Sequence, residues 1–403
     1  MISVGIDVSK GKSTICILKP YGEILMSPHD FNHTQSDMKI LVDKLNKYDD
    51  EIHIIMEATG IYHLPIAQYL KSSEYTVYII NPLEMKRYRC QGIRNPKTDR
   101  IDAAIIAQYG IDYWYRSSHN TDIESTREEL KLLGTQYCSF MKVRQSRCLA
   151  LYTLLDRTNP GIYRCIDDYN SKTGKDKLCD FVHDFYHRDC IIKYSKKKFI
   201  ERYQSWSEKR GYRFSGTEAC QLYQVAKESI PSLESTESTK LVVQQTVNTL
   251  KELNTSLFDI LTRMKELAKL MPEYDTVISM KGVGESIGPR LIAEIGDTRR
   301  FHSAKALIAY AGIDAPPYQS GKFTGTERHM SKRGSKIMRK LGYEVMDSIN
   351  KHQASYVGDP VCEYFLKKRA EGKHYGTAMF AAYNKFLRIY HSRVSSVLNE
   401  ANS

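Results

Sequence analysis

The most constraining feature of this sequence is the order in which strand and helix patterns alternate over about the first 115 residues. An apolar strand, Ile2–Val8, ends in the turn Ser9-Lys10-Gly11-Lys12 and is followed by strand patterns at 13–18 and 22–26. A helix then begins near Thr34 or Ser36, either of which is a suitable N-cap. Strand, helix and strand patterns follow at 51–56, 62–70 and 75–80. This order predicts a mixed α/β sheet of the kind found in ribonuclease-H-like folds.

Composition narrows the class of protein. The 403 residues are 41% hydrophobic and 26% charged, which is typical of a globular protein of two or three domains. No apolar run approaches the roughly 18 residues of a membrane span, and the N-terminus lacks the features of a secretory signal. Nine cysteines without a C-x-x-C pair argue against a disulfide framework or structural zinc. We therefore expect a cytoplasmic protein, and the net charge of +12 favours an anionic partner such as nucleic acid.

Three parts are predicted along the chain. A mixed α/β domain spans 1–118, a helical region spans 119–271, and a mainly helical C-terminal domain spans 272–403. Near the end of the helical region, apolar residues step by three and four: Leu250, Leu253, Leu257, Ile260, Met264, Leu267 and Met271. This heptad seam predicts a coiled coil that pairs subunits in a dimer or tetramer. A core helix packed within one chain has the same pattern, so both interpretations stay open.

The helical region contains a basic segment, at about 157–235, which holds the stretch Ile191–Arg213 with eight basic and two acidic residues. Aromatic residues are interleaved with the basic ones: Tyr194, Phe199, Tyr203, Trp206 and Tyr212. Basic and aromatic residues together suit phosphate contact and base stacking, with Lys196, Lys197 and Lys198 as the main candidates. A solvated helix face is the alternative.

The C-terminal part has three features of its own. Gly282-Val283-Gly284 lies between two apolar helical stretches, as in helix–hairpin–helix modules whose backbone approaches a phosphate. Ser320 lies in the loop Gln319-Ser320-Gly321, which has no evident core role. Five basic residues follow within nine positions and predict contact with a phosphodiester backbone: Lys332, Arg333, Lys336, Arg339 and Lys340.

Four acidic residues are the candidates for catalysis. Asp7 lies inside an apolar strand and Glu57 ends another, where an ionised side chain is costly unless it is paired or metal-bound. If these strands are neighbours, the two carboxylates meet at one edge of the sheet. Asp99 and Asp102 share a helix face after Thr98, a suitable N-cap. Converging carboxylates require a cation, and oxygen ligands favour Mg²⁺ or Mn²⁺, which can support phosphodiester displacement.

The motifs around these residues resemble those of the insertion-sequence-110 transposases, the RNA-guided bridge recombinases. At the N-terminal end they are Gly5-Ile6-Asp7-Val8-Ser9-Lys10, Met56-Glu57-Ala58-Thr59-Gly60 and Lys97-Thr98-Asp99-Arg100-Ile101-Asp102-Ala103. At the C-terminal end they include Ala293-Glu294-Ile295-Gly296-Asp297, Tyr310-Ala311-Gly312, Gln319-Ser320-Gly321 and Lys332-Arg333-Gly334-Ser335-Lys336. The resemblance covers roughly 1–155 and 235–350, so 157–235 looks like an insertion.

The resemblance implies a RuvC-like catalytic domain in which Asp7, Glu57, Asp99 and Asp102 bind the metal. It also implies that Ser320 is a nucleophile that forms a phosphoserine link to DNA. The partners implied are donor DNA, target DNA and a bridge RNA, in a bacterial or archaeal cytoplasm where the protein joins the nucleoid when it acts.

Other functions stay open at this stage. A metal-dependent junction nuclease would use the four carboxylates and water, but it leaves Ser320 without a role. An actin-like ATPase or sugar kinase would use Gly5–Gly11 as a phosphate hairpin, but the sequence offers no second phosphate loop. A non-enzymatic nucleic-acid scaffold would make the carboxylates structural. A pilin-type DNA invertase shares both motifs, so sequence does not separate inversion from transposition.

Overall fold

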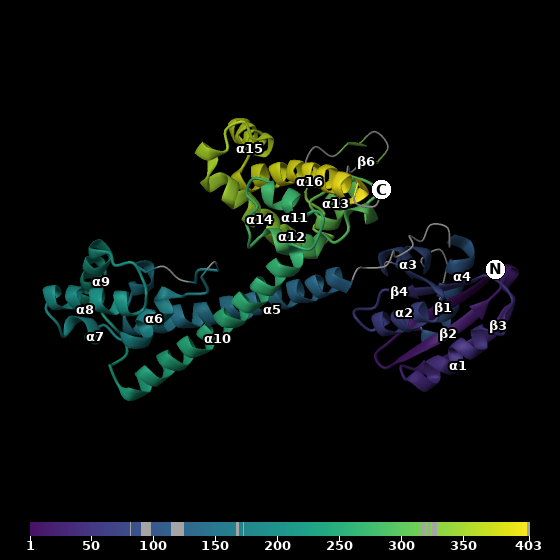
Figure 1. Cartoon of the computed structure of the whole chain (residues 1–403), viewed down its shortest axis with the longest axis horizontal. Coiled ribbons are helices and arrows are strands. Elements are labelled where there is room, and N and C mark those ends of the chain that lie inside the picture. The colour runs from purple at the N-terminus through teal and green to yellow at the C-terminus, as the bar shows by residue number, and fades with distance from the viewer. Residues whose placement is uncertain are drawn as a thin grey trace. The chain divides into compact units, whose positions relative to one another are not determined.

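The computed structural model describes residues 1–80, 82–89, 98–113, 125–166, 169–171, 173–315, 319–320, 323–324 and 329–400. The chain forms two compact units, Met1–Ile123 and Glu124–Ser403 (Figure 1). The division into domains at 118/119 and 271/272 stays a prediction, and the two units are described separately.

The N-terminal unit is built on a mixed sheet of five strands. They are β1 (Ile2–Val8), β2 (Lys12–Leu18), β3 (Ile24–Asn32), β4 (Ile52–Glu57) and β5 (Thr76–Ile80). Their order is β3-β2-β1-β4-β5; β2 is antiparallel to both of its neighbours, whereas β1, β4 and β5 run parallel. The predicted ribonuclease-H/RuvC-like class is confirmed by this order, and β1 and β4 are neighbours as the site prediction required.

Helices cover both faces of this sheet. They are α1 (Gln35–Leu45), α2 (His63–Ser72), α3 (Pro82–Arg89) and α4 (Asp99–Tyr113), and a short 3-10 turn spans Pro20–Gly22. Thr34 caps α1 as predicted, because its hydroxyl accepts a hydrogen bond from the Asp37 backbone N–H at 3.2 Å. The even residues of β1, from Ile2 to Val8, pack in the same core as α1 and α2. The odd residues of β1 therefore face α4, as strand geometry requires.

The second unit begins with two long helices that pack along each other, α5 (Ser125–Thr158) and α10 (Glu237–Ala268) (Figure 1). The heptad seam lies on α10, and Leu250, Leu257 and Met264 are fully buried inside this unit. Side chains already buried within one chain are not available to a second subunit. The prediction that this seam pairs subunits is therefore wrong, and the intramolecular interpretation is confirmed. A dimer or tetramer formed through other surfaces stays a prediction.

The basic segment between these helices folds into a small helical core of its own. Its elements are a 3-10 turn (Ile162–Arg164), α6 (Lys177–Asp184), α7 (Asp189–Ile192), α8 (Lys196–Lys209) and α9 (Gly216–Glu228). Phe199 and Tyr203 are fully buried in that core, and Trp206 packs against it. Buried rings cannot stack on bases, so the prediction of a base-stacking surface is wrong for Phe199 and Tyr203. The aromatic residues of α8 recur at three and four residues because they lie on the side of the helix that faces this core.

The remaining helices pack around α16 (Tyr375–Glu400), whose Tyr383, Phe386 and Tyr390 are buried. The other elements are α11 (Tyr274–Ser279), α12 (Gly288–Ile295), a 3-10 turn (Thr298–Arg300), α13 (Ala304–Ala311), β6 (Gln319–Ser320), β7 (Phe323–Thr324), α14 (Lys336–Lys351), a 3-10 turn (Gln353–Ser355) and α15 (Pro360–Ala370). Among the helices described, none is long and apolar enough to cross a membrane.

The glycine hairpin between α11 and α12 has a packing role. Gly282 has φ +79°, and a Cβ there would lie 2.6 Å from Ile349 Cγ1 and 2.7 Å from the Val345 carbonyl oxygen. Both atoms belong to α14, so the helix–hairpin–helix prediction is confirmed in outline while Gly282 serves close packing. Gly284 has open space around it and stays a candidate for phosphate contact.

The buried seam generates a stability prediction. Leu257→Asp should lower the free energy of unfolding by more than about 3 kcal/mol, because it buries an unpaired carboxylate. Leu241 is a matched control on the same helix, since it is 58% exposed against 0% for Leu257. Leu241→Asp should leave the unfolding temperature nearly unchanged in a calorimetric scan. A Leu257→Asp variant that keeps its stability but falls in mass by light scattering would restore the subunit-pairing interpretation.

Candidate active site

Two carboxylates meet at one edge of the N-terminal sheet. The parallel register of β1 and β4 pairs Gly5 with Ile55 and Ile6 with Met56. Asp7 and Glu57 are the next residues along these strands, so both lie at the carboxyl ends of neighbouring parallel strands. The carboxyl edge of a parallel sheet is where α/β proteins commonly place their ligand sites.

Helix α4 brings the other two carboxylates to this edge. Thr98 caps the helix as predicted, since its hydroxyl accepts from the Ile101 N–H at 3.3 Å and its carbonyl accepts from the Asp102 N–H at 2.9 Å. Asp102 is buried, whereas Asp99 is exposed. Asp99 and Asp102 lie three residues apart on α4, on one face of the helix as predicted, but Asp102 lies deeper in the site.

Helix α4 approaches β1 closely because Gly5 has no side chain. A Cβ at Gly5 would lie 2.2 Å from the Ala107 nitrogen and 2.3 Å from the Ala103 carbonyl oxygen. The Ser3 hydroxyl, two residues earlier on the same face, donates to the Ala107 carbonyl oxygen at 2.7 Å. These contacts fix the distance of the first two turns of α4 from β1, and with it the position of Asp102.

The electrostatics show that these carboxylates influence one another. The pKa of Asp7 is raised from its ordinary value of 3.8 to about 6, chiefly by burial and then by the charges of Asp102, Asp99 and Glu57. Arg89 has the opposite effect. A carboxyl group whose pKa is raised towards neutral pH by burial and like charges is typical of a functional site.

Arg89, at the end of α3, is a member of this site that the sequence analysis missed. Its Nη2 donates to Glu57 Oε2 at 2.9 Å, and its Nε lies 3.5 Å from Asp102 Oδ1. Among the described residues, no three His, Cys, Asp or Glu side chains form a ready metal cluster. The sequence places Lys86, Arg87 and Arg89 on one short helix, and nothing in their order distinguishes the one that turns inward.

The donor set nevertheless fits a hard divalent cation. Asp7, Glu57 and Asp102 supply only carboxylate oxygens, the ligands that Mg²⁺ and Mn²⁺ prefer, and their mutual repulsion already requires a positive charge. Asp99 is exposed beside them. That these four residues hold such an ion stays a prediction.

Ser320 belongs to the second unit. It lies in β6, whose backbone pairs with β7 so that Ser320 stands opposite Phe323. The predicted loop is therefore a short hairpin, of which the structure describes the backbone at residues 319, 320, 323 and 324.

Comparisons with known proteins bear on both units. A family model described as "Transposase" (DEDD_Tnp_IS110) matches residues 4–160, and one described as "Transposase IS116/IS110/IS902 family" matches residues 274–358. The chain belongs to the IS110 family of transposases. Asp7, Glu57, Asp99 and Asp102 lie in the first matched range of this transposase, and Ser320 lies in the second. Residues 161–273 and 359–403 lie outside both.

The transposase is similar to several known proteins at low identity. It is 23% identical over 379 residues to the "Insertion element IS116 uncharacterized 44.8 kDa protein" of Streptomyces clavuligerus, covering 92% of this chain and 89% of that one. It is 23% identical over 344 residues to the "Pilin gene-inverting protein" of Moraxella bovis, covering 83% and 79%. Among solved structures, Thermus thermophilus RuvC matches with a TM-score of 0.24 and 12% identity, over 29% of this chain and 96% of that one. Because this score is low, the fold assignment rests on the strand order.

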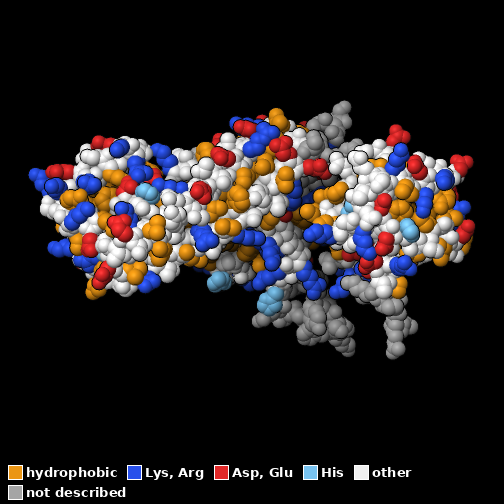
Figure 2. Space-filling view, turned by 90° about the horizontal axis from the view of Figure 1, so that it is seen from below, with side chains coloured by type: hydrophobic (Ala, Val, Ile, Leu, Met, Phe, Trp, Pro, Cys, Tyr) orange, Lys and Arg blue, Asp and Glu red, His pale blue; other side chains and the backbone are white. Residues whose placement is uncertain are grey.

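The predicted nucleic-acid contacts of the transposase differ in their surroundings. Lys196, Lys197 and Lys198 are exposed on the first turn of α8. Lys332, Arg333 and Lys336 are also exposed. Arg339 is half-buried, and its Nη1 donates to the carbonyl oxygens of Ala311 and Gly334 at 3.0 and 3.1 Å. Figure 2 shows basic side chains spread over the visible face, so these contacts stay predictions.

The raised pKa of Asp7 generates a pH-dependent prediction. The folded protein holds the Asp7 proton more tightly than the unfolded chain does, so ionisation of Asp7 above about pH 6 opposes folding. Asp7→Asn should therefore raise the unfolding temperature of the metal-free transposase at pH 8 by a few degrees, roughly. The gain should fade as the pH drops from 6 towards 4, where Asp7 is neutral. Thermal unfolding with a chelator at pH 8 and pH 4.5 measures both effects.

Asp43→Asn, at an exposed position of α1, is the control and should change neither value. A lower unfolding temperature for Asp7→Asn at pH 8 would show that Asp7 stabilises the fold through its charge, against this account.

Proposed function

We propose that this transposase cuts and rejoins DNA strands through a covalent phosphoserine link made by Ser320. In this proposal Asp7, Glu57 and Asp102 hold Mg²⁺ or Mn²⁺, with Asp99 beside them. The observation that supports it most is the convergence of the carboxylates at the edge of β1 and β4, where burial and like charges raise the pKa of Asp7.

The chemistry follows from the groups available. A bound divalent cation supplies positive charge at the scissile phosphate and lowers the pKa of an oxygen that it contacts. The Ser320 hydroxyl loses its proton and forms a bond to phosphorus, while the departing deoxyribose oxygen leaves and takes up a proton. The new phosphoserine conserves the phosphodiester linkage, so a hydroxyl of another strand can displace Ser320 and reseal the DNA. Recombination needs this conservation, whereas hydrolysis does not.

The two groups lie in different units of the chain, so the proposal requires a composite site. The carboxylates have no nucleophile of their own other than water, and Ser320 lacks a neighbouring histidine in the sequence except His329. We propose that the carboxylate site serves Ser320 of the same or another subunit in a dimer or tetramer. Recombination joins two DNA duplexes, and symmetric assemblies bring two sites together.

The proposed substrates are donor and target DNA, and the proposed guide is a bridge RNA. The net charge of +12 supports an anionic partner, and the exposed lysines of the first turn of α8 support RNA contact outside the two matched family ranges. Three lysines at the positive end of a helix are unfavourable without an anion nearby.

A second candidate function is site-specific inversion of DNA, favoured by the similarity to the Moraxella bovis pilin gene-inverting protein. Inversion and transposition use the same strand chemistry and differ in the DNA ends that are joined. A third candidate, a RuvC-like junction nuclease, uses water in place of Ser320.

The adduct experiment separates recombination from hydrolysis. Incubating the transposase with its co-purifying RNA and DNA that spans the ends of its element should give a protein–DNA adduct that survives denaturant. Ser320→Ala should abolish the adduct and the recombinant product while DNA binding is retained. Asp7→Ala should abolish the adduct as well, because the cation would be lost. Ser320→Cys should keep slight activity at most, because thiolates are good nucleophiles but have different metal preferences.

Ser396→Ala, at an exposed serine of α16, is the matched control and should form adduct normally. Peptide mapping of the trapped adduct identifies the attached residue. Attachment at any residue other than Ser320, or recombinant product from Ser320→Ala, would make the hydrolytic nuclease the better interpretation.

A further inference from the structure

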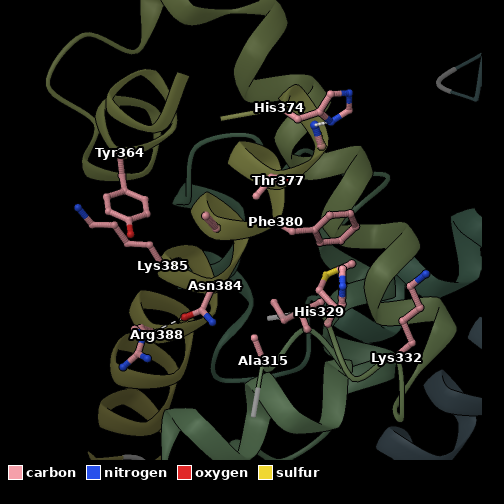
Figure 3. Close-up of a pocket in the computed structure, with 14 residues that line it drawn as sticks. Ala315, His329, Lys332, Tyr364, His374, Thr377, Phe380, Asn384, Lys385 and Arg388 are labelled. Atoms are coloured by element: carbon pink, nitrogen blue, oxygen red, sulfur yellow. Dashed lines mark hydrogen bonds between the residues drawn. The ribbon is translucent and has the colours of Figure 1, made fainter. Parts of the chain in front are cut away.

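A cleft in the described part of the second unit is lined by residues on both sides, in sequence, of the hairpin that carries Ser320. Its volume is about 1110 Å³. One wall comes from the first half of α16 together with Tyr364 of α15. The other wall comes from Ile313, Ala315, His329, Met330 and Lys332, which precede and follow the hairpin along the chain (Figure 3).

The cleft is positively charged. Its described lining includes Lys332, Lys385 and Arg388 and contains neither Asp nor Glu. Among the described residues Arg388 donates to the neutral Asn384, with Nε to Oδ1 at 3.0 Å, and Lys385 lies over the Tyr364 ring at 5.2 Å. Figure 3 shows Lys385 and Arg388 together on one side of the cleft and Lys332 on the other. Cations on two walls suit a polyanion that passes between them.

Lys332 is held there by a strained backbone. Its φ is +52°, in the left-handed region that a lysine seldom adopts. Its backbone N–H donates to the Gly312 carbonyl oxygen at 3.0 Å, and a Cβ at Gly334 would lie 2.3 Å from the Tyr310 carbonyl oxygen. The Arg339 side chain also holds this segment in place, because its Nη1 donates to the carbonyl oxygens of Ala311 and Gly334. Backbone strain maintained by close contacts is concentrated at functional positions.

We propose that this cleft binds the backbone of the single DNA strand that Ser320 attacks. The identity of the strand rests on the proposed function, because residues 315 and 329 lie five and nine positions from Ser320 along the chain. The volume slightly exceeds the range of small-ligand pockets, roughly 300–1,000 Å³, which leaves room for a few nucleotides. Phe380 offers a ring for base stacking. Because α15 and α16 lie beyond residue 358, this wall is outside the matched family range.

The test compares two arginines of the same helix. Arg388 lines the cleft, whereas Arg393 does not, and both are exposed. With a fluorescein-labelled 12-nucleotide single-stranded DNA, Arg388→Ala should weaken binding several-fold and reduce the salt slope of log K by about 0.7 for each phosphate that the variant no longer neutralises. Lys385→Ala with Arg388→Ala should reduce it by about twice as much. Arg393→Ala should match the wild type, and unfolding temperatures check that each variant folds.

Two results would overturn the proposal. Wild-type affinity and slope in the double variant would overturn the proposal, as would loss of binding to a 12-nucleotide RNA but not to DNA. If the adduct maps to another residue while Arg388→Ala still weakens DNA binding, the nucleophile assignment fails and the cleft assignment survives.

A separate observation concerns Arg89 in the N-terminal unit. Its guanidinium engages Glu57 and Asp102, while its Nε is buried without a hydrogen-bond partner of good geometry. Two positive charges among the same carboxylates repel each other strongly at short distance. From this geometry we infer that Arg89 is an internal counter-cation that competes with the divalent ion for Glu57 and Asp102. The inference rests on the proposed metal site.

Calorimetric titration with Mn²⁺ tests this role without any measurement of activity. Arg89→Gln should bind Mn²⁺ several-fold more tightly than the wild type, and its metal-free form should unfold at a lower temperature. Saturating Mn²⁺ should close that gap in unfolding temperature. Arg87→Gln is the matched control, because Arg87 is exposed on the same helix. If the wild type binds Mn²⁺ and Arg89→Gln binds it no more tightly, this inference alone fails. If neither protein binds Mn²⁺, the metal proposal fails with it.

Discussion

The mutual repulsion of carboxylates at one edge of the N-terminal sheet is the constraint on which the arrangement of that unit depends. Asp7 is ionised only at a cost, since burial and its acidic neighbours raise its pKa to about 6. The fold brings these groups together nonetheless, through the parallel pairing of β1 with β4 and the close approach of α4 at Gly5. Arg89 offsets part of the charge. In the proposed function, stability is given up at this edge to keep a site for a cation.

In the second unit, buried charge pairs and hydrogen bonds hold the elements that carry the basic residues in a fixed conformation. Glu294, in a family motif, accepts hydrogen bonds from Lys131 and Ser335 at 2.6 Å each and from the Tyr310 hydroxyl at 3.1 Å. Arg127 forms a bidentate pair with the fully buried Glu273, at 2.6 and 3.0 Å. Buried charges are tolerated when every one is paired. These pairs attach α5 to the C-terminal helices, and Glu294 ties the start of α14 to α12, next to the segment that places Lys332.

In the proposed function, the two units supply different groups for strand transfer. One unit concentrates negative charge suited to a metal, and the other combines the Ser320 hairpin with a cationic cleft. The proposed composite site would combine these two sets of groups.

The sequence by itself determined the elements and the candidate carboxylates. Apolar periodicity predicted the strands, and residue type predicted the cap of α1, because both signals are local. Asp7 and Glu57 were conspicuous as charges at apolar strands. Only the tertiary structure decided which face of a helix is buried. It made the α10 seam and the aromatic residues of α8 part of the core, because a pattern of apolar side chains does not specify the partner that covers it. It also selected Arg89 from three basic residues on α3, since the direction of a long side chain depends on contacts between residues distant in the sequence.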